Sequence, residues 1–151
     1  MTIIALASDH AGYALKALLA DELRAAEREV LDLGAHSDAS VDYSDYGFAI
    51  AQAVADGRAS SGIAVCGSGI GISIAANRIA GARAALCTSG LMARLARTHN
   101  DANILCLGSR IVGVEVARDC VHEFLNTAFA GGRHSARVAK LDAVIYREAA
   151  E

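Results

Sequence analysis

The sequence predicts an α/β fold in which a five-stranded parallel sheet carries helices on both faces. Short aliphatic and β-branched runs alternate with longer segments whose apolar residues recur at helical spacing. Polar residues and glycines follow three of the runs, at 8–10, 66–68 and 108–110. Ligands of parallel sheets bind beyond the carboxyl ends of the strands, so we expect a site there. The 151 residues suit a single domain over residues 1–151.

The first half of the chain contributes three strands. Residues 2–7 (TIIALA) form a β-branched run that ends at Ser8-Asp9, and the leucines of 11–27 recur near helical spacing with charges between them. Gly34 stops the second run, and the polar residues after it show no period, which is typical of a loop. The predicted elements are strand 2–7, helix 11–27, strand 30–33, loop 36–45, helix 46–55, strand 63–66 and helix 72–78.

The second half contributes two more strands. Apolar side chains recur along one side of 89–98 and of 112–128, and Gly131-Gly132 separates the second of these segments from a last helical pattern. Because no strand follows that last helix, we expect it to pack on a second subunit. The predicted elements are strand 82–87, helix 89–98, strand 104–107, helix 112–128 and helix 134–148.

The composition argues against several classes of function. The net charge is −3 and the basic residues form no block, so we expect no nucleic-acid partner. No apolar stretch approaches the ~18 residues of a membrane helix, and the start of the chain is typical of a strand rather than a signal peptide. The four cysteines lack C-x-x-C spacing, which indicates free thiols in a reducing cytoplasm. The histidines lack metal-site spacing, so we expect no metal.

The stretch CGSGIG at 66–71 is the densest glycine cluster in the chain. It lacks the third glycine of a dinucleotide fingerprint and the lysine of a Walker loop. Such a stretch forms either a tight turn or a loop whose backbone N–H groups converge on an anion, bound permanently or formed during a reaction. Cys66 favours the transient anion, because a helix N-terminus or a cation lowers the pKa of a thiol from about 8.5 and makes it a usable base.

A base beside an anion-binding loop is what an aldose–ketose isomerase needs. Cys66 would move a proton between C1 and C2 of a sugar through a cis-enediolate, whose negative oxygen the amides of 67–71 would hold. A cysteine hydrolase stays open as an alternative, since His99 could approach Cys66 in space. A non-catalytic module that binds a phosphosugar also stays open.

Candidate ligands for a phosphate stand on the last helix and at one strand end. Arg133 and Arg137 are one helical turn apart, so they form either a solvated basic face or a bidentate phosphate clamp. Arg110 follows the fifth strand and is a third possible cation. All three arginines therefore remain candidates for binding an acidic substrate.

Two polar dipeptides stand at other element ends. Asp9-His10 follows the first strand and is either a cap of the next helix or part of the site. His99-Asn100 ends the fourth helix, where a histidine is favourable at the helix dipole, or belongs to the site as well. His36 and His122 have no such neighbours, and we interpret both as structural.

Six motifs occur in a fixed order along nearly the whole chain: SDHAG at 8–12, VDYSDYG at 41–47, CGSGIGISIAANR at 66–78, RTHNDAN at 97–103, LGSRIVG at 107–113 and GGRHSARV at 131–138. In these motifs the chain resembles the type B ribose-5-phosphate isomerase family, which includes the galactose-6-phosphate isomerase subunits. The resemblance implies a Rossmann-like three-layer fold and a cofactor-independent isomerase of sugar phosphates. It also implies a homodimer or dimer of dimers with active sites shared between subunits.

The resemblance further implies a role for each matching residue. Cys66 would be the general base, Asp9 would contact the sugar and help with its hydroxyl protons, and the partner's His99 would open the furanose ring. The enediolate would be stabilised by the Ser68 hydroxyl and by amides near Gly67, Gly69 and Gly71. Substrate would be bound by His10, Tyr43, Asn100, Arg110, Arg133 and Arg137.

Two departures from the family pattern bear on the choice of sugar. The family usually has Thr where this chain has Ser68 and Pro where it has Ser44, and the missing proline frees the backbone beside Tyr43. We expect reversible conversion of D-ribose 5-phosphate to D-ribulose 5-phosphate. Allose 6-phosphate, galactose 6-phosphate and a tetrose phosphate stay open as alternatives, because the geometry of the subunit interface sets the length of the pocket.

Overall fold

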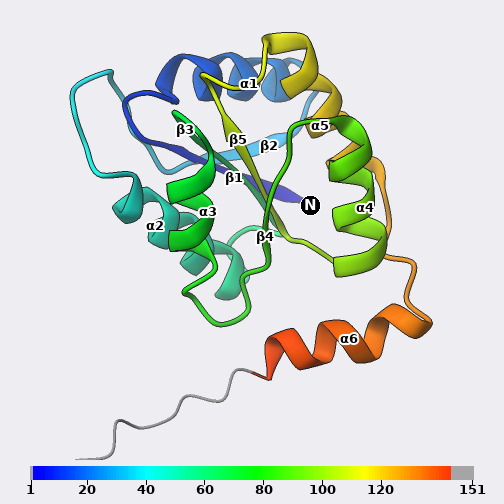
Figure 1. Cartoon of the computed structure of the whole chain (residues 1–151). Helices are drawn as coiled ribbons and strands as arrows, with labels where there is room; N and C mark the ends of the chain where they lie inside the picture. The colour runs from blue at the N-terminus through cyan, green and yellow to red at the C-terminus, as the bar shows by residue number, and fades with distance from the viewer. Residues whose placement is uncertain (1, 144–151) are drawn as a thin grey trace, which may run out of the picture.

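A computed structural model describes residues 2–143, which are built around a five-stranded sheet (Figure 1). All neighbouring strands are parallel, in the order β2-β1-β3-β5-β4. The predicted number and direction of the strands are therefore confirmed. The strands are β1 (Ile3–Ser8), β2 (Glu29–Asp32), β3 (Ser61–Cys66), β4 (Ala84–Leu86) and β5 (Ile104–Gly108).

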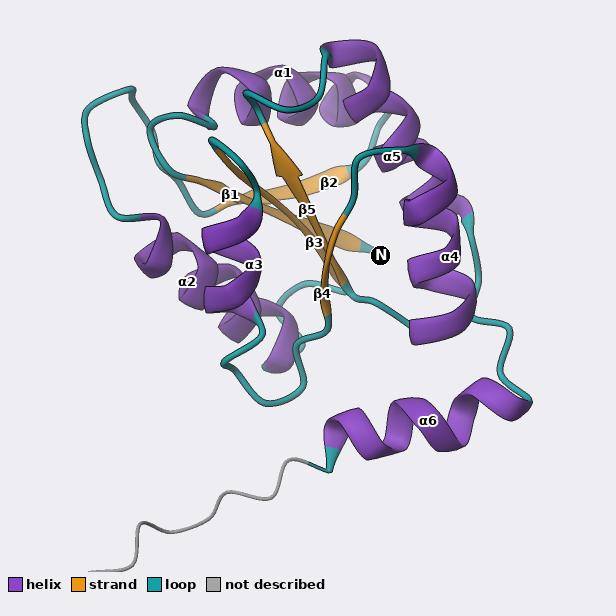
Figure 2. Cartoon of the chain, viewed as in Figure 1, coloured by secondary structure: helices purple, strands orange, loops and turns teal. Residues whose placement is uncertain are grey.

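Helices cover both faces of this sheet, as predicted (Figure 2). The core on one face is closed by α1, α4 and α5, and the core on the other by α2 and α3. The last helix, α6, lies outside these layers and contacts α4 (Figure 1). The helices are α1 (Tyr13–Ala25), α2 (Tyr43–Ala55), α3 (Ile70–Ala76), α4 (Gly90–Asn100), α5 (Val114–Asn126) and α6 (Arg133–Asp142).

The two faces of the sheet bury different side chains. In β1, Ile4 and Leu6 belong to the core under α1, α4 and α5, whereas Ala5 and Ala7 belong to the core under α2 and α3. All four side chains are at most 1% exposed. Burial on both faces explains why the strands are recognisable in the sequence as nearly continuous apolar runs.

Two helices begin earlier than the sequence predicts. The loop predicted for 36–45 ends at Asp42, and α2 starts at Tyr43 rather than at residue 46. Asp42 has an extended backbone, and the acidic Asp45 lies in the first turn, where the helix dipole favours a negative charge. Helix α3 starts at Ile70 rather than at residue 72, because Gly69 turns the chain with a φ of +77°.

Strand β4 and the helices α1 and α5 are shorter than predicted, each helix by two residues at both ends. Strand β4 covers Ala84–Leu86 instead of 82–87, because Ala82 donates its N–H to Ile79 in a turn and Arg83 donates its N–H to the side chain of Asn103. The last helix was predicted for 134–148, and α6 runs from Arg133 to Asp142. The predicted part at 144–148 lies outside the described residues.

The strand order brings the carboxyl ends of β1 and β3 into direct contact. Strands β1 and β3 are neighbours, but their helices leave toward opposite faces of the sheet, which creates a switch point between them. The N–H of Asp9, just after β1, donates to the carbonyl of Val65 in β3. We call the side of the sheet at Ser8, Cys66 and Gly108 the carboxyl edge, and the opposite side the amino edge.

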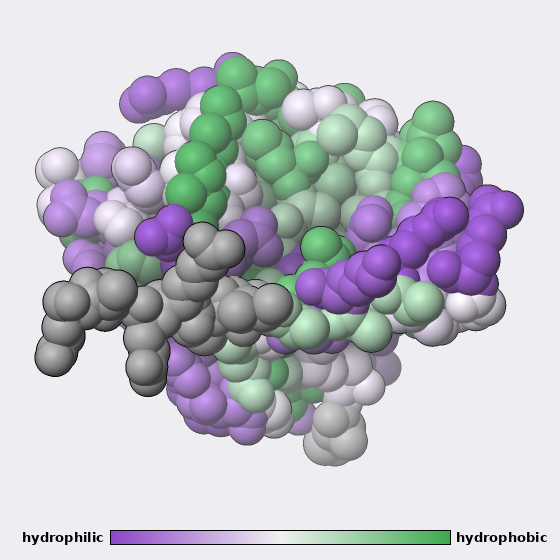
Figure 3. Space-filling model, turned by 60° about the horizontal axis from the view of Figure 1, so that its bottom comes forward, coloured by the Kyte–Doolittle hydropathy of each residue, from purple (hydrophilic) through white to green (hydrophobic). Residues whose placement is uncertain are grey.

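Large apolar side chains are exposed on three helices, α3, α4 and α6. The face at the bottom of Figure 1, where α6 lies, carries apolar areas next to strongly polar ones (Figure 3). Among the described residues, no helix is both long enough and apolar enough to cross a membrane. The exposed apolar residues of these helices are Ile70 and Ile74 of α3, Leu91, Met92 and Leu95 of α4, and Leu141 of α6.

Candidate active site

The cysteine of the glycine cluster is the last residue of β3. Cys66 is 3% exposed, and its Sγ accepts a hydrogen bond of 3.1 Å from the N–H of Gly69. Gly69 achieves this with a φ of +77°, and a Cβ there would lie 2.5 Å from Leu86 and 2.9 Å from the Leu107 carbonyl carbon. Only glycine fits this turn, which aims a backbone donor at the sulfur.

A cavity of about 400 Å³ opens beside this sulfur at the carboxyl edge. It brings together predicted residues from five separate segments of the chain. Ala11 and Ile111 also line it and were not predicted, since apolar residues carry no chemical signal beyond their position beside Asp9-His10 and Arg110. The lining residues are Asp9, His10, Ala11, Tyr43, Cys66, Gly67, Ser68, Gly71, Arg110 and Ile111.

The carboxylate of Asp9 both stabilises the turn before α1 and lines the cavity. Its Oδ1 accepts the N–H of Gly12 at 3.0 Å, which orders the turn before α1. Its Oδ2 has no hydrogen-bond partner within residues 2–143, and the side chain lines the cavity. Next to it, Nδ1 of His10 lies 3.1 Å from both the N–H and the carbonyl of Val41. His10 therefore ties the 36–42 loop to the rim of the cavity.

A cation lies over the glycine loop from the turn after β5. The N–H groups of Ser109 and Arg110 donate to the carbonyls of Cys66 and Gly67, both at 2.9 Å. A Cβ on Gly67 would lie 3.3 Å from Nη1 of Arg110, so the guanidinium covers this residue. Arg110 forms no ion pair with any other described residue, which leaves its charge for an anion.

The remaining wall of the cavity comes from Tyr43 and from the loop itself. The Tyr43 ring packs against Gly71, where a Cβ would lie 2.6 Å from the ring. Tyr43 is still 47% exposed, so its other side is open to a ligand. Oγ of Ser68 accepts the N–H of Ile70 at 3.2 Å, which leaves the hydroxyl proton to be donated elsewhere.

The other predicted site residues lie at the amino edge. His99 and Asn100 end α4, and Arg133 and Arg137 stand on the first turns of α6, all exposed. Strand β5 runs between the two edges and spans about 13 Å. His99 and Cys66 of one chain are therefore separated by the full height of the sheet. The ring of His99 stacks on His134, at 4.4 Å between centroids and 14° between planes.

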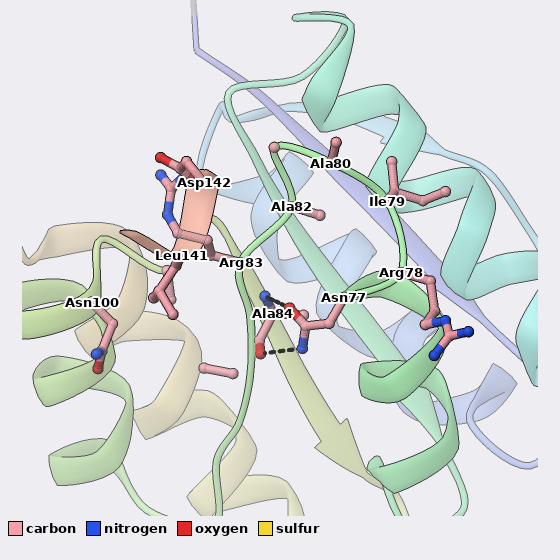
Figure 4. A pocket seen from close by; sticks show the side chains of 13 residues that line it. Asn77, Arg78, Ile79, Ala80, Ala82, Arg83, Ala84, Asn100, Leu141 and Asp142 are labelled. Atoms are coloured by element: carbon pink, nitrogen blue, oxygen red, sulfur yellow. Dashed lines mark hydrogen bonds and ion pairs between the residues drawn. The ribbon is translucent and has the colours of Figure 1, made fainter. Parts of the chain in front are cut away.

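A larger hollow of about 720 Å³ lies at the amino edge, between residues 77–85 and the end of α6 (Figure 4). Of the predicted site residues, Asn100 lines this hollow. The side chain of Asn77, which also lines it, accepts the N–H of Ala84 and donates to its carbonyl, and so closes the edge of β4. This hollow contains no thiol and no histidine. The smaller cavity at the carboxyl edge is lined by a thiol, a carboxylate and a histidine. It is therefore the better candidate for an active site.

The other three cysteines sit in different surroundings. All four thiols are free and buried. Burial raises the pKa of Cys87 to about 12 and that of Cys120 to about 11, and it raises the pKa of Cys106 well above its ordinary value. These three residues remain protonated thiols and line no part of the cavity. Within residues 2–143, no group of His, Cys, Asp and Glu side chains is arranged to hold a metal ion.

Known proteins are similar to this chain in sequence and in fold. Residues 4–141 match the model of a family described as ribose/galactose isomerase. Ribose-5-phosphate isomerase B of Escherichia coli is 44% identical over 97% of this chain and 99% of its own length. A solved Clostridium thermocellum ribose-5-phosphate isomerase B is 51% identical, with a TM-score of 0.92 over 93% of this chain and 95% of that one. The Mycoplasma genitalium enzyme with bound ribulose-5-phosphate is 41% identical, with a TM-score of 0.89 over 93% and 94%.

Proposed function

The chain belongs to the ribose/galactose isomerase family, and we propose that the thiol of Cys66 is the base of its reaction. The protein is an aldose–ketose isomerase that interconverts D-ribose 5-phosphate and D-ribulose 5-phosphate, the substrate pair of its relatives. The observation that carries the assignment of the base is the sulfur of Cys66 beside the cavity, with the N–H of Gly69 pointing at it.

The proposed proton transfer starts from the open-chain aldose. The Cys66 thiolate removes the proton from C2, and the electron pair forms the C1–C2 double bond while the aldehyde oxygen becomes negative. The thiol then returns the proton to C1, and the hydroxyl proton of O2 moves to O1, which leaves a ketone at C2. We assign the transfer of that second proton to Oδ2 of Asp9, which has no hydrogen-bond partner within residues 2–143.

The negative oxygen of the intermediate needs donors that are not already used. The N–H of Gly69 serves the sulfur, so we assign the enediolate to the hydroxyl of Ser68, to amides near Gly67 and Gly71, and to the unpaired cation of Arg110. These groups line the same cavity as Cys66. Donors fixed before the reaction stabilise developing charge without reorganisation.

A second copy of the chain supplies the missing part of the site in this proposal. One chain presents a base at the carboxyl edge, and it presents His99, Asn100, Arg133 and Arg137 at the amino edge. In a two-fold dimer the amino edge of each copy can complete the carboxyl edge of the other. The exposed apolar residues of α3, α4 and α6 are suited to such an interface. The free thiols favour a cytoplasmic location.

The base assignment is tested with Cys66→Ala. We expect the exchange of the C2 proton of ribose 5-phosphate with deuterated solvent, followed by NMR, to fall by about 10²–10⁴. Binding of ribose 5-phosphate, measured by calorimetry, should be largely retained. Cys120→Ala removes another buried thiol and is the matched control. Exchange at the wild-type rate in Cys66→Ala would refute the role of this thiol, and binding without exchange in the wild type would indicate a binding module.

The sugar is tested separately with a substrate panel. We expect kcat/KM to be highest for ribose 5-phosphate among tetrose, pentose and hexose phosphates, including allose 6-phosphate and galactose 6-phosphate. Pocket walls set this preference, and Ser68 and Tyr43 form part of them. A higher kcat/KM for a six-carbon phosphate would leave the chemistry in place and reassign the substrate.

A further inference from the structure

His134, which no part of the reaction so far uses, has a specific position against His99. Its ring lies 4.4 Å from the His99 ring and within 14° of parallel. The two residues are 35 positions apart and belong to different helices, α6 and α4. Such a flat, close contact between two aromatic rings restricts how either ring can turn.

The segment between α5 and α6 is tied down so that this stack forms. The N–H of Ala130 donates to the carbonyl of Thr98, next to His99, at 3.1 Å. Nε of Arg97 donates to the carbonyl of Thr127 at 3.2 Å. Gly131 and Gly132 then turn the chain with φ values of +63° and +56°, and α6 starts directly on the end of α4. These hydrogen bonds to backbone carbonyls and the two glycine turns therefore fix where α6 starts, and with it the stack of the two rings.

The surroundings of His134 lower the pKa of its imidazole. Desolvation, His99 on α4, and Arg133 and Arg137 on α6 all lower the pKa of His134. These are the titratable and charged groups that face this ring from the two helices. The lowered pKa favours the neutral imidazole of His134, so this ring stacks on His99 without adding a positive charge beside it.

We propose that His134 is a positioning residue that holds the imidazole of His99 in the orientation needed to open the sugar ring. The inference rests on the proposed function. In ring opening the bond between C1 and the ring oxygen breaks, the ring oxygen takes a proton from His99, and the C1 hydroxyl gives its proton to water. The side chain of His134 touches His99 and acts through it.

The two substrates separate this role from proton transfer at carbon. Ribose 5-phosphate is mostly a furanose and needs ring opening. Ribulose 5-phosphate cannot close such a ring, because its C5 oxygen carries the phosphate. Exchange of its C1 proton with solvent therefore needs Cys66 but not His99. A defect in the stack should slow isomerisation of ribose 5-phosphate and spare this exchange.

The experiment compares His134→Ala, His134→Phe and the control His122→Ala, an exposed histidine of α5 that is not stacked. We expect His134→Ala to isomerise ribose 5-phosphate about ten- to a hundredfold more slowly at saturating substrate. The C1 exchange of saturating ribulose 5-phosphate should stay within about twofold of the wild type. His134→Phe retains a flat ring and should restore isomerisation, and His122→Ala should behave as the wild type.

Three results would overturn the proposal: unchanged isomerisation in His134→Ala, an equal loss of exchange and isomerisation, or a folded His134→Phe as slow as His134→Ala. Failure of the proposed function has a different signature. In that case the wild type would not exchange the C1 proton of ribulose 5-phosphate, or Cys66→Ala would exchange it unimpaired.

Discussion

At the scale of single residues, Cys66 differs from the other thiols by its neighbours rather than by its burial. Cys106 and Cys87 are as deeply buried, but their sulfurs lie in the apolar core, where desolvation raises the pKa. The Cys66 sulfur lies beside a cavity and accepts a backbone N–H. One backbone donor and the neighbouring cavity therefore distinguish the Cys66 sulfur from the other thiols.

The arginines of α6 lead to a prediction about substrate binding. Arg137→Ala should raise KM for ribose 5-phosphate about tenfold or more and change kcat less than about threefold, because a phosphate anchor binds ground and transition states alike. Lys140→Ala, on the same helix, is the control. Steady-state kinetics and competition by inorganic phosphate measure the effect. A large fall in kcat with an unchanged KM would be incompatible with an anchoring role.

The sequence located the polar site residues better than the apolar ones. Asp9, Cys66 and Arg110 follow strand ends, and the rule for parallel sheets brings such residues together. Ile111 and Ala11 carry no chemical signal, so their place in the cavity required coordinates. The stack of His134 on His99 depends on the path of the α5–α6 segment, which local sequence does not specify.

At the scale of elements, the glycine loop depends on one backbone conformation. Gly69→Ala should destabilise the fold by about 1–3 kcal/mol, because alanine is strained at positive φ and its Cβ would also meet Leu86 and Leu107. Activity should fall as well, since the N–H of this residue would leave the sulfur of Cys66.

A matched control separates strain from contact. Gly57 has a similar φ of +73°, but a Cβ there would meet nothing within 4 Å. Gly57→Ala should therefore pay the conformational strain and keep full activity. Denaturant unfolding and isomerase assays on both variants measure the two effects. Full activity in Gly69→Ala would show that the bond from this amide to the sulfur is dispensable.

The connection after β2 is held by a buried ion pair and gives a prediction about pH. Nζ of Lys16, 1% exposed, binds Oδ1 of Asp32 at 2.6 Å and the Ala35 carbonyl at 2.7 Å, and Ala35 pairs with Ser8 beside Asp9. Burial alone would raise the pKa of Asp32, but hydrogen bonds from Lys16 and from the N–H of Gly34 lower it below its ordinary value. The pair therefore stabilises the fold only while Asp32 is ionised.

For a carboxyl with a lowered pKa, this stabilisation is present above the unfolded value of about 3.9 and is lost as pH falls through the folded value. Between about pH 5 and pH 2, the wild type should lose more unfolding free energy than Asp32→Asn does. Denaturant titrations at several pH values measure the difference, with the exposed Asp21→Asn as the control. Parallel curves for the wild type and Asp32→Asn would contradict this role of the pair.

The order and type of the elements were predictable, and their ends were less so. Alternating apolar runs and helical patterns are set by burial on both faces of the sheet, which the sequence displays directly. The start of α2 at Tyr43 was missed, because the flanking Ser44 and Asp45 are as common in loops as in a first helical turn. The Tyr43 ring at that start packs against Gly71, a tertiary contact that the local sequence does not specify.

At the scale of the whole molecule, the predicted site residues form two half-sites at opposite edges of the sheet. The six motifs contain residues of both half-sites, but His99 lies where β5 begins and Cys66 lies beside the end of β5. This separation follows from the alternation of parallel strands and helices, because a helix that leads into a parallel strand ends at the amino edge. The spacing of the motifs alone does not display it. In the proposed mechanism, each copy alone therefore presents a base without an acid at one edge and a phosphate clamp without a base at the other.

Mixed dimers show whether two copies of the chain complete one another's sites. Cys66→Ala and His99→Ala chains carrying different tags are expressed together, and dimers containing one of each are purified. Each mixed dimer then has one site with both groups intact and one with neither, so it should isomerise ribose 5-phosphate at about half the wild-type rate. Both pure variants should be nearly inactive. Mixed dimers as inactive as the two parents would mean that Cys66 and His99 act within the same chain, and would contradict the account.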